Sequence, residues 1–209
     1  MAPDVYATAR RAARRRAALA SRAASRARAR RHARLFALTG VQPGMRVVDI
    51  GCGALGLRAL EPGLDITGVD VFPRPAYPGP FVQADAAERL PFADGEFDLA
   101  YCSSVVEHIA PERRARFAGE LCRVARGRYV QTPAWSFPIE PHALLPFAHW
   151  LPPPLRRPYW RLGAQGEWED VRLLRRAEVR ALFGGTLHAE RWGPLVKSWI
   201  AIVPVDSGL

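Results

Sequence analysis

A short apolar run that leads into a glycine-rich turn constrains the fold of this chain more than any other feature. Residues 47–50 read Val-Val-Asp-Ile, and Gly51-Cys52-Gly53-Ala54-Leu55-Gly56 follows at once. An apolar run that ends in glycines indicates a buried strand. Glycine allows a positive φ and a close approach of the backbone to a ligand. The segment therefore predicts a parallel α/β sheet with a ligand site at the carboxyl end of its first strand.

The rest of the chain continues this alternation of strand and helix. We expect further strands at 65–71, 81–83, 96–101 and 129–131, and helices at 55–60, 111–124 and 173–183. Strands separated by helices pair in parallel through right-handed crossovers. Two last strands, 187–191 and 198–203, are joined by a loop with Gly193 and Pro194, which favours an antiparallel hairpin. The sequence thus predicts an α/β fold, a doubly wound sheet of about seven strands, mostly parallel with an antiparallel last strand.

The charge of the chain is concentrated at its N-terminal end. The formal net charge is +10, and residues 1–34 hold 11 arginines against one acid, Asp4. Residues 35–209 are left with 19 basic and 19 acidic side chains. We therefore divide the chain into a basic Arg/Ala-rich arm, 1–34, and a neutral catalytic domain, 35–209. The arm is interpreted as a solvated helical or disordered segment, or as a binder of phosphate-rich partners such as nucleic acid.

Cysteine and hydropathy patterns bear on compartment and metal content. The three cysteines, Cys52, Cys102 and Cys122, form no C-x-x-C pair, and no apolar run reaches the ~18 residues of a membrane span. We expect reduced thiols, no structural metal, no transmembrane segment and a cytoplasmic protein.

Two classes of cofactor compete for the glycine turn. Gly51, Gly53 and Gly56 satisfy the spacing G-x-G-x-x-G, and Asp70 follows at about the distance expected of an acid that binds a ribose. A nicotinamide-dependent oxidoreductase is therefore an alternative at this point.

Further motifs follow the turn in a fixed order. They are Ile66-Thr67-Gly68-Val69-Asp70-Val71, Gln83-Ala84-Asp85-Ala86, Phe97-Asp98 and Cys102-Ser103-Ser104-Val105-Val106-Glu107-His108-Ile109. Together with Asp49-Ile50-Gly51-Cys52-Gly53, this order resembles the S-adenosylmethionine (SAM) dependent methyltransferases of class I, of the small-molecule, methyltransferase type 11-like family. The resemblance extends from about 45 to 130 and implies a Rossmann-like fold with SAM as cofactor.

The resemblance also implies roles for individual residues. The glycine loop should pass the methionine part of SAM, Asp70 should accept hydrogen bonds from both ribose hydroxyls, and the region of Asp85 and Ala86 should contact adenine. The residues predicted to bind the cofactor are Asp49, Gly51, Cys52, Gly53, Asp70, Val71, Asp85, Ala86 and Ser103, with Ser104 as an alternative to the last. The family usually has GCGTG at the turn, whereas Leu55 stands here at the third glycine and Gly56 follows one residue later.

The acceptor side is predicted beyond the fifth strand. Residues 133–168 are rich in proline and aromatic side chains, which suits a rigid lid over a pocket. His108, Glu140 and His142 are candidate catalytic residues for acceptor binding or proton removal, and structural hydrogen bonds within the lid are the competing interpretation. The aromatic residues also allow an interfacial role and a lipid-linked acceptor.

We interpret the chain as an enzyme that transfers a methyl group from SAM to a small-molecule or lipid-linked acceptor. The alternatives are a nucleic-acid methyltransferase that uses the basic arm, a nicotinamide-dependent oxidoreductase, and a SAM-fold module without turnover.

Overall fold

A seven-stranded sheet organises the molecule. The computed structural model describes residues 33–163 and 170–205, so most of the predicted basic arm lies outside the described residues. The strand order is β3-β2-β1-β4-β5-β9-β8. The strands are β1 (Arg46–Ile50), β2 (Asp65–Asp70), β3 (Phe81–Gln83), β4 (Phe97–Ser103), β5 (Ala125–Pro133), β8 (Thr186–Trp192) and β9 (Leu195–Val203).

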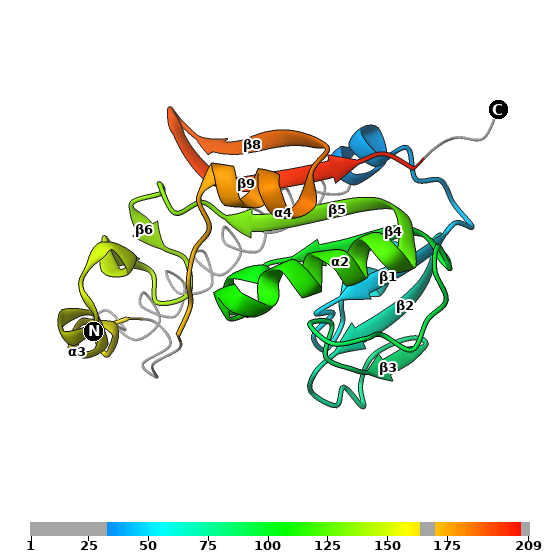
Figure 1. The fold of residues 1–209 in the computed structure, drawn as a ribbon, viewed down its shortest axis with the longest axis horizontal. Coiled ribbons are helices and arrows are strands. Elements are labelled where there is room, and N and C mark those ends of the chain that lie inside the picture. The colour runs from blue at the N-terminus through cyan, green and yellow to red at the C-terminus, as the bar shows by residue number, and fades with distance from the viewer. Residues whose placement is uncertain (1–32, 164–169, 206–209) are drawn as a thin grey trace, which may run out of the picture.

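The pairing of the strands confirms the predicted architecture. Strands β1 to β5 run parallel to one another, whereas β9 is antiparallel to both β5 and β8. The carboxyl ends of the parallel strands therefore meet at one edge of the sheet, toward the left of Figure 1 for β4 and β5. The expected hairpin forms between β8 and β9, with a register shift after Glu190.

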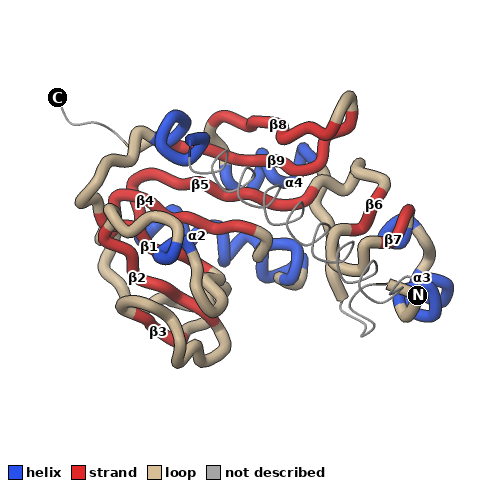
Figure 2. The backbone as a smooth tube through the Cα atoms, turned by 180° about the vertical axis from the view of Figure 1, so that it is seen from behind, coloured by secondary structure: helices blue, strands red, loops and turns tan. Residues whose placement is uncertain are grey.

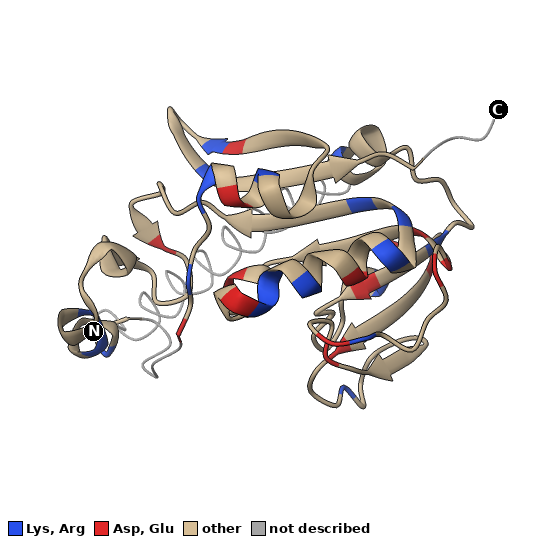
Figure 3. Ribbon diagram, viewed as in Figure 1, with Lys and Arg blue, Asp and Glu red and all other residues tan. Residues whose placement is uncertain are grey.

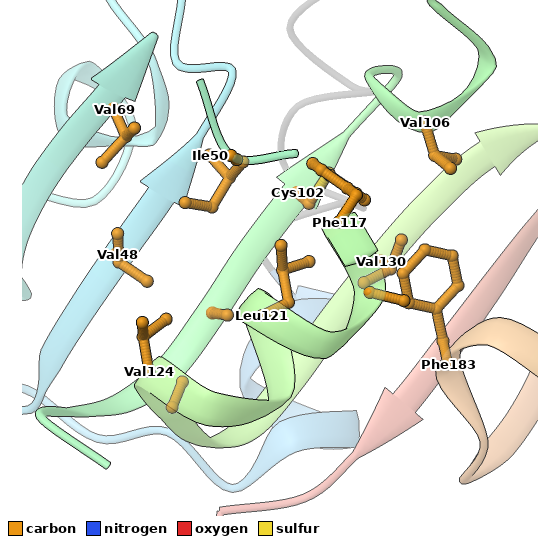
Figure 4. Close-up of a cluster of buried hydrophobic side chains, with 14 of the residues drawn as sticks. Val48, Ile50, Val69, Cys102, Val106, Phe117, Leu121, Val124, Val130 and Phe183 are labelled. Atoms are coloured by element: carbon orange, nitrogen blue, oxygen red, sulfur yellow. The ribbon is translucent and has the colours of Figure 1, made fainter. Parts of the chain in front are cut away.

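Each face of the sheet buries its own apolar layer. On one face, α2 (Arg114–Val124) and α4 (Arg176–Phe183) cover the strands. Figure 4 shows Phe117, Leu121 and Val124 of α2 directed at Val48 and Val130 of the sheet. The helix over residues 33–39 covers the other face, seen in Figure 2, where Leu35 packs with side chains from β1, β5 and β9. Apolar burial on both faces explains the near-continuous apolar runs of the parallel strands.

The predicted helix over 55–60 is wrong. The structure has only a single 3-10 turn, Leu57–Ala59, preceded by turns. Gly56 adopts a φ of 57°, which interrupts an α-helix, and Leu55 is left 60% exposed. The connection from β1 to β2 is therefore a compact turn, although the two strands still pair in parallel.

The other two predicted helices begin later than expected. Residues 111–113 form a 3-10 turn, and α2 follows from Arg114. Leu174 forms a parallel bridge with Ala134, so α4 starts only at Arg176. Both α2 and α4 carry basic and acidic side chains together, as Figure 3 shows, in agreement with the neutral composition of this part of the chain.

The described part of the segment predicted as a lid, up to residue 163, lies beyond the carboxyl end of β5 in both views of the backbone (Figures 1 and 2). It contains the small hairpin β6 (Ile139–Glu140) and β7 (Leu145–Pro146), then a 3-10 turn, Ala148–Trp150, and α3 (Pro153–Trp160). Its own small core includes Trp160 and Ala143, which pack on Val171 and Leu173. Within 33–163 and 170–205, no helix has the length and apolar character that crossing a membrane requires.

Candidate functional site

Asp70 connects the second strand to the glycine turn. Its Oδ2 accepts a hydrogen bond of 3.0 Å from the backbone N–H of Gly53, and its Oδ1 accepts one of 2.9 Å from Phe72. Arg74 donates to Oδ2 from Nε at 3.0 Å. Burial alone would raise the pKa of Asp70, but the hydrogen bonds from Arg74 and the two backbone groups outweigh it and hold the pKa below its usual value. The side chain is therefore a carboxylate at neutral pH.

A cleft of about 550 Å³ opens at the carboxyl edge of the sheet, beside Asp70. Five of the residues predicted to bind the cofactor line it: Gly51, Asp70, Val71, Asp85 and Ala86. Phe72, Val105 and Ile109 add apolar surface, and His108 lines the same cleft. A mainly apolar concave site with few polar groups is typical of a small-molecule pocket.

Four other predicted residues are not among those that line this cleft. Asp49 is buried beneath the turn, where its Oδ2 accepts a hydrogen bond of 2.6 Å from Leu57 N–H. Burial raises its pKa to about 6, against the hydrogen bond from Leu57. The Cys52 thiol is also buried, which raises its pKa to about 12. Gly53 takes part through its N–H to Asp70, and Ser103 lines a neighbouring cavity.

Two glycines of the turn are required by their surroundings. Gly51 has a φ of 71°, and a Cβ there would overlap the side chain of Val105. At Gly56, a Cβ would overlap Oδ2 of Asp49 and approach the Tyr77 ring to 2.9 Å. Gly56, the third glycine of the turn, is therefore needed because it packs against the buried Asp49. Leu55, which stands at the family's usual glycine position, is exposed to solvent.

Asp85 is held in place from two sides. Its Oδ1 accepts a hydrogen bond of 2.8 Å from Ala87 N–H, and its Oδ2 forms an ion pair of 2.9 Å with Arg113. Burial would raise its pKa, but these bonds, chiefly the one from Arg113, keep the pKa below the usual value. The carboxylate is thus charged and fixed at the rim of the cleft.

A second cavity of about 420 Å³ adjoins the first, and Ser104 lines both. Its walls come from the ends of β4, β5 and β9 and from the lid segment, including Gln131, Phe137 and Ile139. Ser103 and Ser104 both donate to Oε1 of Gln131, at 2.7 Å and 3.3 Å. The segment predicted as a lid therefore forms part of the wall of a cavity next to the cleft.

The three candidate catalytic residues lie together. Oε1 of Glu140 lies 2.7 Å from Nδ1 of His142, and its Oε2 accepts hydrogen bonds from the backbone N–H groups of His142 (2.8 Å) and Ala143 (2.5 Å). The His142 ring meets the His108 ring edge-on, with centroids 4.9 Å apart. Glu140 is fully buried, so its carboxylate fixes the orientation of His142.

Sequence reasoning missed a fourth member of this cluster, Glu107. Its side chain is fully buried, and its Oε2 accepts a hydrogen bond of 2.9 Å from Thr132. Its Oε1 is buried without a hydrogen-bond partner among the described residues. Burial raises the pKa of Glu107 to about 7, although Thr132 and the charges of His142 and Arg114 oppose the rise. In the sequence, the position of this acid directly before His108 in the Glu-His-Ile motif was a signal that could have identified it.

The central part of the chain is similar to known proteins. Residues 48–128 match the family model described as a methyltransferase domain. An uncharacterized protein of Mycobacterium tuberculosis is 35% identical over 115 residues, which cover 49% of this chain and 41% of that protein. A demethylmenaquinone methyltransferase of Beutenbergia cavernae is 35% identical over 112 residues, covering 46% and 45%. The chain thus spans less than half the length of these curated relatives.

A solved structure shares the fold over nearly the whole chain. The 1,6-didemethyltoxoflavin-N1-methyltransferase of Burkholderia thailandensis, determined with 1,6-didemethyltoxoflavin and S-adenosylhomocysteine, superposes with a TM-score of 0.54. The two sequences are 16% identical, and the match covers 97% of this chain and 89% of the other.

Proposed function

Because residues 48–128 match the family model described as a methyltransferase domain, we propose that the chain is a class I SAM-dependent methyltransferase that transfers a methyl group from SAM to a small organic acceptor. The observation that carries the proposal is the convergence of Gly51, Asp70, Asp85 and Ala86 on one cleft at the carboxyl ends of the parallel strands. Ligands of open α/β sheets bind at that edge. The described residues also match the chemistry of the cofactor.

The cleft suits an adenosyl group in three respects. Asp70 offers a charged carboxylate, and a ribose diol supplies two hydroxyl donors for it. Val71, Phe72 and Ile109 offer apolar surface to an aromatic base. Gly51 keeps the turn free of a side chain that would overlap Val105. SAM, when bound, supplies a methyl group on a sulfonium that is already activated for transfer.

The acceptor side is assigned to the second cavity and to the cluster of His108, Glu140 and His142. Methyl transfer depends strongly on positioning and on the exclusion of water, with a general base where the acceptor must lose a proton. We assign the acceptor's reacting group to this cluster, because His108 lines the cofactor cleft while Ile139 and Pro141, on either side of Glu140, line the second cavity.

The residues that line the second cavity indicate the class of acceptor. Its walls combine Phe137, Ile139 and Leu144 with the polar groups Ser103 and Gln131, which suits an apolar ring with a polar substituent. One relative is named a demethylmenaquinone methyltransferase and one structural neighbour a 1,6-didemethyltoxoflavin-N1-methyltransferase, in agreement with a small organic acceptor. A lipid-linked acceptor is compatible with the exposed Leu144, Phe147 and Trp150 of the lid segment.

Calorimetric titration of the full chain with SAM and, in parallel, with NADH tests the proposal. We expect one SAM bound per chain and no saturable heat with NADH. Binding of NADH in preference to SAM would establish the oxidoreductase alternative instead. Neither the fold nor the comparisons support a nicotinamide cofactor or a nucleic-acid substrate.

A further inference from the structure

A group of three side chains, of which His108 lines the cleft, has the composition of a metal site. Glu107, His108 and His142 each offer one ligand atom, and these atoms all lie within 4.8 Å of one another. We propose that these three residues bind a divalent transition-metal ion, with Zn²⁺ as the best match.

The donor set itself points to this class of ion. Two imidazoles and one carboxylate are a well-known set of protein ligands for catalytic zinc, and three protein ligands leave a fourth position for water or substrate. Carboxylates alone would favour Mg²⁺ or Ca²⁺, whereas imidazole favours Zn²⁺ and its neighbours in the first transition row.

The unpartnered oxygen of Glu107 is the second observation. The side chain is 0% exposed, and Oε2 is satisfied by Thr132, but Oε1 is buried without a hydrogen bond among the described residues. A buried carboxylate oxygen without a hydrogen-bond partner destabilises the fold. Coordination to a cation between Glu107 and the two histidines removes that cost, because it supplies both a partner and an opposite charge.

The arrangement around His142 is the third observation. A metal-bound histidine usually directs its other ring nitrogen to a carboxylate, which fixes the tautomer and the ring orientation. His142 directs Nδ1 to Glu140 at 2.7 Å, so the proposed metal ligand is its other ring nitrogen, Nε2. Glu140 in turn is held by two backbone N–H groups and is fully buried, so the ring is oriented before any ion binds.

Binding of an ion would draw the three ligand atoms closer together. Bonds of about 2.1 Å in a tetrahedral site place ligand atoms about 3.4 Å apart, closer than the limit of 4.8 Å found here. Glu107 is buried and His142 is held by Glu140, whereas His108 is exposed, so we assign the closing of the site to a rotation of the His108 side chain.

The site also borders the cleft assigned to SAM, because His108 lines that cleft. A hydroxyl or phenol bound at the open position of a metal ion loses its proton more readily, which produces an oxygen nucleophile at neutral pH. This consequence rests on the proposed function, whereas binding of the metal does not.

Titration of the tag-free full-length chain with Co²⁺, followed by its visible absorption, tests the proposal, and displacement by Zn²⁺ with elemental analysis gives the stoichiometry. We expect one ion per chain. Glu107→Gln and His142→Gln should each weaken Co²⁺ binding at least tenfold, and Glu140→Gln should weaken it about 10-fold to 100-fold as a positioning residue. His188→Gln, a half-buried histidine on β8 outside the cluster, is the matched control and should bind normally.

His108→Gln provides a variant at an exposed position that leaves the core intact, and circular dichroism checks the fold of every variant. Absence of saturable Co²⁺ binding to the wild-type chain overturns the proposal. So does binding that survives unchanged in both Glu107→Gln and His142→Gln, since the ion would then lie elsewhere. Calorimetry with S-adenosylhomocysteine on the same metal-free sample separates this failure from a failure of the methyltransferase assignment.

Discussion

The carboxylate of Asp70 accepts a hydrogen bond of 3.0 Å from the backbone N–H of Gly53, which ties the end of β2 to the turn that follows β1. The acid expected to bind ribose hydroxyls thus also fixes the shape of the glycine loop. Because Oδ1 of Asp70 is bonded to Phe72 at the same time, a single side chain sets the positions of two walls of the cleft. Three sets of variants test the shape of the glycine loop, the titration of the buried Asp49 and the hydrogen bonds of Glu140.

Gly51→Ala should destabilise the fold more than Gly53→Ala. Both glycines have a positive φ, of 71° and 62°, so each alanine carries the strain of a left-handed backbone, about 1–2 kcal/mol. Only at Gly51 does the new Cβ also overlap Val105, and overpacking adds about 1–3 kcal/mol. Urea unfolding of both variants measures the difference. Val105→Ala should recover part of the loss in the Gly51→Ala background but not in the Gly53→Ala background; equal losses in the two single variants would refute the overlap.

Asp49 makes a pH-dependent contribution to stability. Its pKa is about 6 in the folded chain against 3.8 unperturbed, so the folded state binds the proton more tightly than the unfolded state. The associated stabilisation is present below about pH 4 and is lost as the pH rises toward 6 and above, by about 3 kcal/mol in total.

Asp49→Asn keeps an acceptor for the Leu57 N–H but does not titrate. The free energy of unfolding of the wild type minus that of Asp49→Asn should therefore fall between pH 4 and pH 6.5. Urea titrations at half-unit steps of pH measure it, and a difference that stays constant over this range would show that the folded-state pKa is not raised.

Glu140→Ala should unfold the lid hairpin, because it removes the acceptor of two backbone N–H groups and of the His142 ring. Leaving such groups buried without partners costs about 2–4 kcal/mol. His142→Ala keeps both backbone bonds and should cost less than half as much. Amide exchange across 139–146 reports the local opening. If Glu140→Ala exchanges no faster than His142→Ala, Glu140 does not hold the turn.

The sheet could be predicted from the sequence because its strands are short apolar runs bounded by glycine, proline and acids. Val47, Val48 and Ile50 are all buried, as a strand covered on both faces requires. The turn after β1 could not be predicted in the same way. The sequence predicts that Gly56 is part of a helix. Only the fold shows that a side chain at this position would overlap the buried carboxylate of Asp49.

The site was partly predictable for a related reason. Asp70 and Asp85 each follow a strand, and the carboxyl ends of parallel strands meet at one edge, so a common cleft follows from topology. Glu107 and His142 lie close together only because the chain over residues 133–146 folds back beyond the end of β5. No local sequence pattern predicts that course of the chain. The cofactor and acceptor roles of the individual residues remain predictions.

Equilibrium binding of S-adenosylhomocysteine to the wild type, to Asp70→Ala and to Asp65→Ala tests the central claim most directly. Asp65 opens the same strand as Asp70 but is exposed at its far end, so it serves as the matched control. We expect one ligand per chain, an affinity at least tenfold weaker in Asp70→Ala because a ribose diol loses its charged acceptor, and an unchanged affinity in Asp65→Ala. Equal affinity of Asp70→Ala and the wild type, or no binding to the wild type, would contradict the assignment of this cleft to the adenosyl group.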